Sequence, residues 1–156
     1  MVPFEDELRS MPGELIATAR GLLGTLVSDR ARDGSFSLIE HVWHLADLET
    51  MAYEERIRRL IEEDDPELPN FDGDGIAEKR NYRTLRLRDG LKAFGEARER
   101  NLEALAAIEG DTWDRAGTQE GIGRVTLRDI PRMMHEHDES HRAEIEALMV
   151  DLARRR

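Results

Sequence analysis

The chain has 156 residues, a length typical of one domain that can bury an apolar core without covalent cross-links. It contains no cysteine, which excludes disulfides, thiolate metal ligands and a thiol nucleophile supplied by the chain itself. The formal net charge of -11 disfavours binding to a phosphate backbone. We therefore expect a single domain over residues 1–156 that binds no nucleic acid.

The first ten residues are mostly polar and lack the apolar run of a secretory signal peptide. No later segment has the length and apolarity of a membrane span. We expect a protein that does not enter a membrane and that is located in the cytoplasm.

Apolar residues recur at helical spacing in four long segments. The first predicted helix covers about residues 4–27, and the Pro12–Gly13 pair offers an alternative start for its main part. The second predicted helix begins after Ser37, which forms a capping-box pattern with Glu40, and it continues to about residue 63.

Residues 64–75 contain two prolines and two glycines, a composition that predicts a break between helices. This connection is long for a bundle, so we expect it to cross the bundle end or to shape the mouth of a pocket. The third predicted helix covers about residues 81–108, and a second loop covers residues 109–125.

The last predicted helix follows Thr126, which forms a cap with Asp129. Pro131 is expected in its second turn, where it would remove one backbone hydrogen bond and bend the helix entry. Together the segments predict an all-α protein, a four-helix bundle with long connecting loops.

Three histidines lie on the apolar stripes of two predicted helices. His137 and His141 are four residues apart and lie one above the other on the last helix, while His44 shares a stripe with Leu48 on the second. A buried imidazole is unfavourable unless something binds it, and three nitrogen ligands leave coordination positions open on a divalent ion. We predict a metal site; the alternative is that hydrogen bonds in the core satisfy these histidines.

Three neighbouring residues need separate interpretation. His41 lies one turn before His44 and is expected either to replace a ligand or to support one. His135 points away from His137 around the helix, so we interpret it as a surface residue. Asp138 either orients His141 or belongs to a solvated face.

The groups that would hold a cosubstrate are not clear from the sequence. Arg98 lies among apolar residues and either reaches an anionic group or extends from the bundle edge to solvent; we favour the second interpretation. Arg80 and Arg83 are similarly ambiguous. Trp43 and Trp113 either line a pocket or pack as ordinary core or interface residues.

Four stretches, in their order along the chain, carry a resemblance to a known family. They are residues 41–49 (His-Val-Trp-His-Leu-Ala-Asp-Leu-Glu), 68–72 (Leu-Pro-Asn-Phe-Asp), 123–130 (Gly-Arg-Val-Thr-Leu-Arg-Asp-Ile) and 135–145 (His-Glu-His-Asp-Glu-Ser-His-Arg-Ala-Glu-Ile). Over nearly its whole length the chain resembles the DinB/YfiT-like superfamily of small metal-binding helical bundles. The resemblance implies that His44, His137 and His141 bind a divalent ion, typically nickel or zinc.

The resemblance implies several reactions. Relatives include thiol transferases that use bacillithiol, mycothiol or glutathione, maleylpyruvate isomerases, and proteins known only as damage- or stress-induced. Our leading hypothesis is a metal-dependent thiol S-transferase that acts on a small molecule with a low-molecular-weight thiol as cosubstrate, because a metal lowers the pKa of a bound thiol. Activation of water in the same way would give a hydrolase.

Two further hypotheses stay open. The protein is a non-catalytic, stress-associated metal-binding or interaction protein, expected to form a homodimer through one bundle face. Alternatively, it is a degenerate bundle in which a bend at Pro131 has displaced His137 from His44. The sequence leaves open the metal, the thiol, the electrophile, the dimer geometry and whether the site is catalytic.

Overall fold

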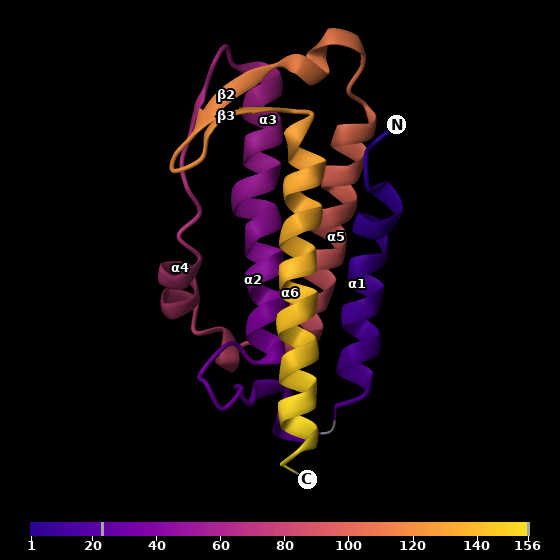
Figure 1. Ribbon diagram of the computed structural model, residues 1–156, viewed down its shortest axis with the longest axis vertical. Helices are drawn as coiled ribbons and strands as arrows, with labels where there is room; N and C mark the ends of the chain where they lie inside the picture. The colour runs from indigo at the N-terminus through magenta and orange to yellow at the C-terminus, as the bar shows by residue number, and fades with distance from the viewer. Residues whose placement is uncertain (23, 156) are drawn as a thin grey trace.

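The computed structural model describes residues 1–22 and 24–155, and four helical columns form a bundle (Figure 1). The elements in chain order are α1 (Glu5–Arg20), a 3-10 turn (Gly24–Ser28), α2 (Leu38–Leu48), a π-helical turn (Glu49–Tyr53), α3 (Glu54–Glu62), β1 (Glu67–Leu68), α4 (Gly73–Arg80), a 3-10 turn (Tyr82–Thr84), α5 (Leu87–Ala106), a 3-10 turn (Gly110–Asp114), β2 (Ala116–Gln119), β3 (Gly123–Thr126) and α6 (Asp129–Ala153). The predicted four-helix bundle is confirmed.

Helix α1 runs without interruption through Pro12, so the alternative start after Pro12 is wrong. Leu8, Met11 and Leu15 are buried along one face of α1, and this packing holds the helix together across the proline. The helix ends at Arg20 rather than near residue 27, and a separate 3-10 turn follows from Gly24, whose φ of 57° favours glycine.

The second column extends from Leu38 to Glu62, in agreement with the sequence. The capping box forms, because the backbone N–H of Ser37 donates to a carboxylate oxygen of Glu40 at 2.9 Å. The π-helical turn Glu49–Tyr53 between α2 and α3 was not predicted. Such turns interrupt the regular hydrogen-bond ladder and often occur at functional sites.

The long connection runs along the side of the bundle. Columns α2–α3 and α5 run in the same direction, so residues 63–86 return the chain along the outside (Figure 1). This return contains α4, which was not predicted and which begins where Asp72 accepts a hydrogen bond from the N–H of Gly75. The third long helix consequently begins at Leu87 rather than near residue 81, because Asn81 ends α4 with a φ of 45°.

The second predicted loop forms a hairpin. Strand β2 pairs antiparallel with β3 and parallel with β1, which gives a small three-stranded sheet at one end of the bundle (Figure 1). Gly121 and Gly123, with φ of 77° and 104°, shape the turn. The protein is therefore mostly helical, and its small sheet is confined to the connections between the helices.

Helix α6 begins at Asp129, later than the sequence predicted. The predicted pair still forms, since the N–H and hydroxyl of Thr126 both donate to one carboxylate oxygen of Asp129. Pro131 is in the first turn of α6, where a backbone N–H has no partner within the helix. The expected loss of a hydrogen bond is therefore wrong, and with it the reason for expecting a bend.

The core consists of two apolar clusters stacked along the bundle. Along α5, Arg98 lies between Phe94 of one cluster and Leu102 of the other, and a buried polar network occupies this level. Among the described residues, no helix combines the length and the apolarity needed to cross a bilayer.

Candidate metal centre

The structure brings together the three histidines that the sequence singled out. His44 projects from α2, and His137 and His141 project from neighbouring turns of α6. Their ring centroids are 5.6 Å apart for His44 and His137, 4.9 Å for His44 and His141, and 4.6 Å for His137 and His141. One ring nitrogen from each lies within 4.8 Å of the others, so the group could hold a metal ion.

The chemistry of these donors fits a divalent ion. The Nδ1 atoms of His44 and His137 are buried without a hydrogen-bond partner among the described residues. Burial lowers the pKa of both imidazoles to about 4 and that of His141 to about 2. All three are therefore neutral at pH 7, with a nitrogen lone pair available for a metal.

His41 is buried and contacts the triad directly. Its Nδ1 lies 2.8 Å from Nδ1 of His141, a hydrogen-bond distance. We expected His41 either to replace a metal ligand or to support one. Its contact with His141 favours the supporting role. A second group of potential ligands, formed by His41, His141 and the exposed Glu144, shares His141 with the first.

His135 lies outside the triad, as predicted, but it is half-buried and not a surface residue. Its ring stacks on Phe4 with centroids 4.5 Å apart, which places it between α6 and the N-terminal residues.

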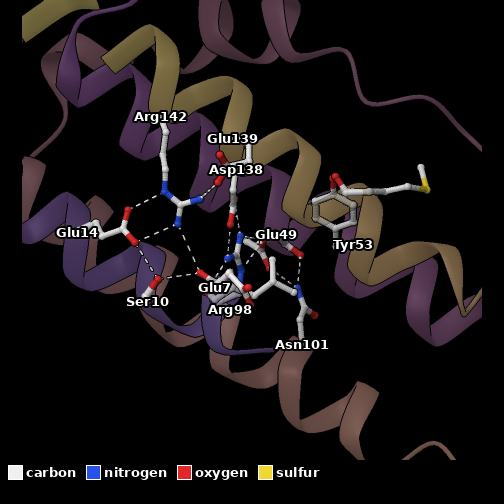
Figure 2. A network of polar contacts seen from close by, with 12 residues as sticks. Glu7, Ser10, Glu14, Glu49, Tyr53, Arg98, Asn101, Asp138, Glu139 and Arg142 are labelled. Carbon is white, nitrogen blue, oxygen red and sulfur yellow. Dashed lines mark hydrogen bonds and ion pairs between the residues drawn. The ribbon is translucent and has the colours of Figure 1, made fainter. Parts of the chain in front are cut away.

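Arg98 and Asp138 belong to a buried ionic network, so Arg98 does not extend to solvent and Asp138 does not lie on a solvated face (Figure 2). The anionic groups that Arg98 reaches are carboxylates of the chain itself, and the partner of Asp138 is Arg98 rather than His141. The guanidinium of Arg98 is 2% exposed and donates to Asp138 at 2.7 and 2.9 Å and to Glu49 at 3.0 and 2.7 Å. Asn101 donates to the other carboxylate oxygen of Glu49 at 2.7 Å and to its backbone carbonyl. Burial raises the pKa of Glu49, although Arg98 opposes this effect. The network joins the π-helical turn, which contains Glu49, to α5 and α6.

The other candidate residues have structural contacts. Arg80 forms an ion pair with Asp47 at 2.7 Å, and Arg83 donates to the carbonyl of Ser28. The indole N–H of Trp43 donates to the carbonyl of Arg86, and that of Trp113 donates to the carbonyl of Ile108. None of these four candidates lines the cavity beside the triad.

A cavity of about 730 Å³ opens beside His44 and His137. Its walls come from four parts of the chain: Tyr53 and Arg56 from the α2–α3 column, Phe71 and Gly73 from the long connection, Gln119 and Val125 from the hairpin, and Arg132, Met133 and His137 from α6. The expectation that the long connection shapes a pocket is confirmed. Arg56 and Gln119 were not identified from the sequence, because their places in the wall depend on the unpredicted π-helical turn and hairpin.

The approach of the long connection to the triad is close. A Cβ atom built on Gly73 would lie 2.9 Å from Cε1 of His44. A glycine is therefore required at this position if α4 is to pack against the imidazole.

Comparison with known proteins places these features in a family. The family model described as the DinB superfamily matches residues 7–145. YfiT from Bacillus subtilis, described as a probable metal-dependent hydrolase with an unusual four-helix bundle topology, has a similar structure with a TM-score of 0.84. The two chains are 20% identical, and the match covers 94% of this chain and 83% of that one, so the likeness is one of fold. No curated protein matches this chain in sequence. The match over most of its length shows that the chain belongs to the DinB superfamily.

Proposed function

We propose that the protein is a metal-dependent enzyme in which His44, His137 and His141 hold one divalent ion, nickel or zinc. The observation that carries the proposal is that two of these histidines line an open cavity large enough for a small molecule. A non-catalytic metal protein needs no open cavity beside its ion, and a degenerate bundle would have its histidines displaced from one another. Both alternatives agree less well with this geometry.

The preferred reaction is transfer of a low-molecular-weight thiol to an electrophile. When bound, the ion would lower the pKa of a coordinated thiol and so supply a thiolate at neutral pH. The chain has no cysteine, so the thiol must come from a cosubstrate, and the volume of the cavity suits a cosubstrate larger than water. Leu48, Phe71 and Val125 provide apolar wall that could contact the carbon skeleton of a cosubstrate.

Hydrolysis is a second candidate, and one specific observation favours it. The fold is similar to that of YfiT, whose description is a probable metal-dependent hydrolase. In that case an ion held by the same three imidazoles would lower the pKa of a water molecule, which would be the nucleophile. The homodimer and the cytoplasmic location expected from the sequence stay predictions.

The first test is the metal content of untagged protein, measured by elemental mass spectrometry. We expect about one ion per chain from a site of this donor set. The His44→Ala, His137→Ala and His141→Ala variants should each lose the ion and keep most of their helix content. His135→Ala is the matched control on α6 and should keep the ion.

Unchanged metal stoichiometry in the three variants, or no metal after reconstitution with several divalent ions, would show that the site assignment is wrong. A metal-loaded protein then separates the two reactions. Consumption of an electrophile only when a thiol is present indicates transfer, and consumption without a thiol indicates hydrolysis.

A further inference from the structure

Three arginines line the cavity beside the triad, and they differ in their partners. Arg124 is exposed and pairs with Asp65 at 2.9 Å, and Arg132 is exposed and pairs with Glu136 at 3.2 Å. Arg56 is only 5% exposed. It is therefore the cavity arginine that has lost most of its contact with water.

Arg56 gains little in return for this burial. Among residues 1–22 and 24–155, no carboxylate forms an ion pair with Arg56, and its buried Nε has no hydrogen-bond partner. The nearest compensation is the ring of Tyr53, whose centroid lies 5.7 Å from the guanidinium carbon. Arg98 shows the contrast, since it is equally buried and contacts two carboxylates. A buried guanidinium without an anion is unfavourable, so its presence here calls for a ligand.

Unpartnered buried polar atoms are concentrated in this cavity. The described part of the chain contains five such side-chain atoms, and four of them belong to residues that line the cavity: His44, Arg56, Gln119 and His137. The two histidines are the proposed metal ligands. The unpartnered atom of Gln119, from β2, is its amide oxygen Oε1, an acceptor suited to a hydrogen-bond donor on a ligand.

The guanidinium of Arg56 lines the same cavity as His44 and His137 of the triad. The charge of Arg56 contributes to lowering the pKa of His137, after burial and the charge of Arg98. The cavity lining has three arginines and three carboxylates (Asp74, Asp129 and Glu136), and the three imidazoles are neutral. A divalent ion at the triad would therefore give the cavity a net positive charge. Such a site selects an anionic ligand.

We propose that Arg56 binds a carboxylate of the substrate or thiol cosubstrate, whose reacting group lies at the ion held by His44, His137 and His141. The placement of the reacting group at the ion rests on the function proposed above. A planar guanidinium matches a carboxylate through two parallel hydrogen bonds, so one such group suits a single carboxylate. The ligand class is a small carboxylic acid that carries a thiol or an electrophilic centre.

The test compares pairs of thiols on cobalt-loaded protein. One series contains ω-mercaptocarboxylates of increasing chain length, and the other contains the mercaptoalcohols of the same lengths. Sulfur-to-cobalt charge-transfer absorption reports binding of the thiol. We expect the best-fitting mercaptocarboxylate to bind at least about tenfold more tightly than its alcohol, from one charged hydrogen-bonded pair.

Variants assign the preference to a residue. Arg56→Met should lose the preference for the carboxylate and keep the affinity for the alcohol, and Arg56→Lys should recover part of the preference. Arg132→Met removes another cavity arginine, one with its own carboxylate partners, and should keep the preference. An unchanged preference in Arg56→Met, or none at any chain length in the unmodified protein, would overturn the proposal.

Failure of the metal site is recognised separately. The visible cobalt spectrum before any thiol is added shows whether the triad holds the ion, and its absence would contradict the proposed function. In that case the Nε–H resonance of Arg56 is followed by NMR during titration of metal-free protein with propionate. A saturable shift supports the anion site, and no shift overturns it.

Discussion

Nδ1 of His41 lies 2.8 Å from Nδ1 of His141, and both rings are buried. A hydrogen bond between two ring nitrogens requires a proton on one of them. If His141 carries it and His41 accepts, Nε2 of His141 keeps its lone pair for a metal ion. Support of this kind fixes the tautomer and the orientation of a metal ligand.

The first prediction tests this support. His41→Phe keeps the volume of the ring and removes the acceptor, so it should lower zinc affinity by about 10–100-fold, as loss of such a partner typically does. Competition with a chromophoric chelator measures the affinity. His135→Phe, on the other side of α6, should leave it unchanged. If Glu144→Gln weakened binding as strongly as His41→Phe, the ion would lie instead in the group formed by His41, His141 and Glu144.

The second prediction concerns the contact of α4 with His44. In Gly73→Ala the new methyl group would lie 2.9 Å from Cε1 of His44, so either α4 or the imidazole must move. We expect a loss of metal affinity with little change in the helix content of the protein. Gly13→Ala is the matched control, because a Cβ at Gly13 meets nothing within 4 Å. Equal zinc affinity in both variants would show that α4 does not constrain His44.

The triad was predictable because helical phase depends only on the local sequence. Residues 130–152 carry buried apolar side chains at helical spacing, and His137 and His141 fall on the same stripe. His44 shares a stripe with Leu48 in the same way. A pattern of this kind predicts which side chains face the core, and the prediction does not require the residues that pack against them from other helices.

The missed features all depend on residues distant in the sequence. Arg98 was correctly noted among apolar neighbours, but its partners Glu49 and Asp138 come from two other helices. The sheet joins β1 to β2 across the end of the bundle, and neither strand is long enough to give an alternating pattern. The π-helical turn likewise has no local signal, although its first residue, Glu49, is held by Arg98 and Asn101.

The third prediction concerns this buried network. Arg98→Met leaves the carboxylates of Glu49 and Asp138 buried without their cation, which should lower the free energy of unfolding by about 3–5 kcal/mol. Chemical denaturation measures the change. Arg9→Met removes an exposed arginine that pairs with Glu99 and should change stability far less than Arg98→Met does.

A rescue variant separates the charge effect from a packing effect. Adding Glu49→Gln and Asp138→Asn to Arg98→Met removes both stranded charges and should restore part of the lost stability. A triple variant less stable than Arg98→Met alone would indicate that packing dominates.

The fourth prediction concerns acid. Burial lowers the pKa of His41, His44 and His137 to about 4, below the ordinary value of 6.5. Below pH 6.5 these histidines are therefore protonated in the unfolded chain but still neutral in the folded chain. The metal-free protein should lose stability as the pH falls toward 4. Each histidine of this kind contributes a slope of up to about 1.4 kcal/mol per pH unit. Denaturation curves of metal-free protein at several pH values measure the slope, which His137→Phe should reduce. A slope equal to that of the unmodified protein would contradict the assignment.

The last prediction links the stability of the bundle to its proposed ligand. Arg56 is buried without a carboxylate partner among the described residues, and burial lowers the pKa of its guanidinium. Arg56→Met replaces the charge with an apolar side chain of similar length and loses only the contact with Tyr53. The variant should therefore be more stable than the unmodified protein by about 0.5–2 kcal/mol, the range typical of single stabilising substitutions. Thermal unfolding in ligand-free buffer measures this change, with Arg132→Met as the control expected to show no gain. Destabilisation by Arg56→Met would mean that the guanidinium has a structural role, and a gain in stability combined with loss of carboxylate binding would mean that this arginine is retained for its ligand.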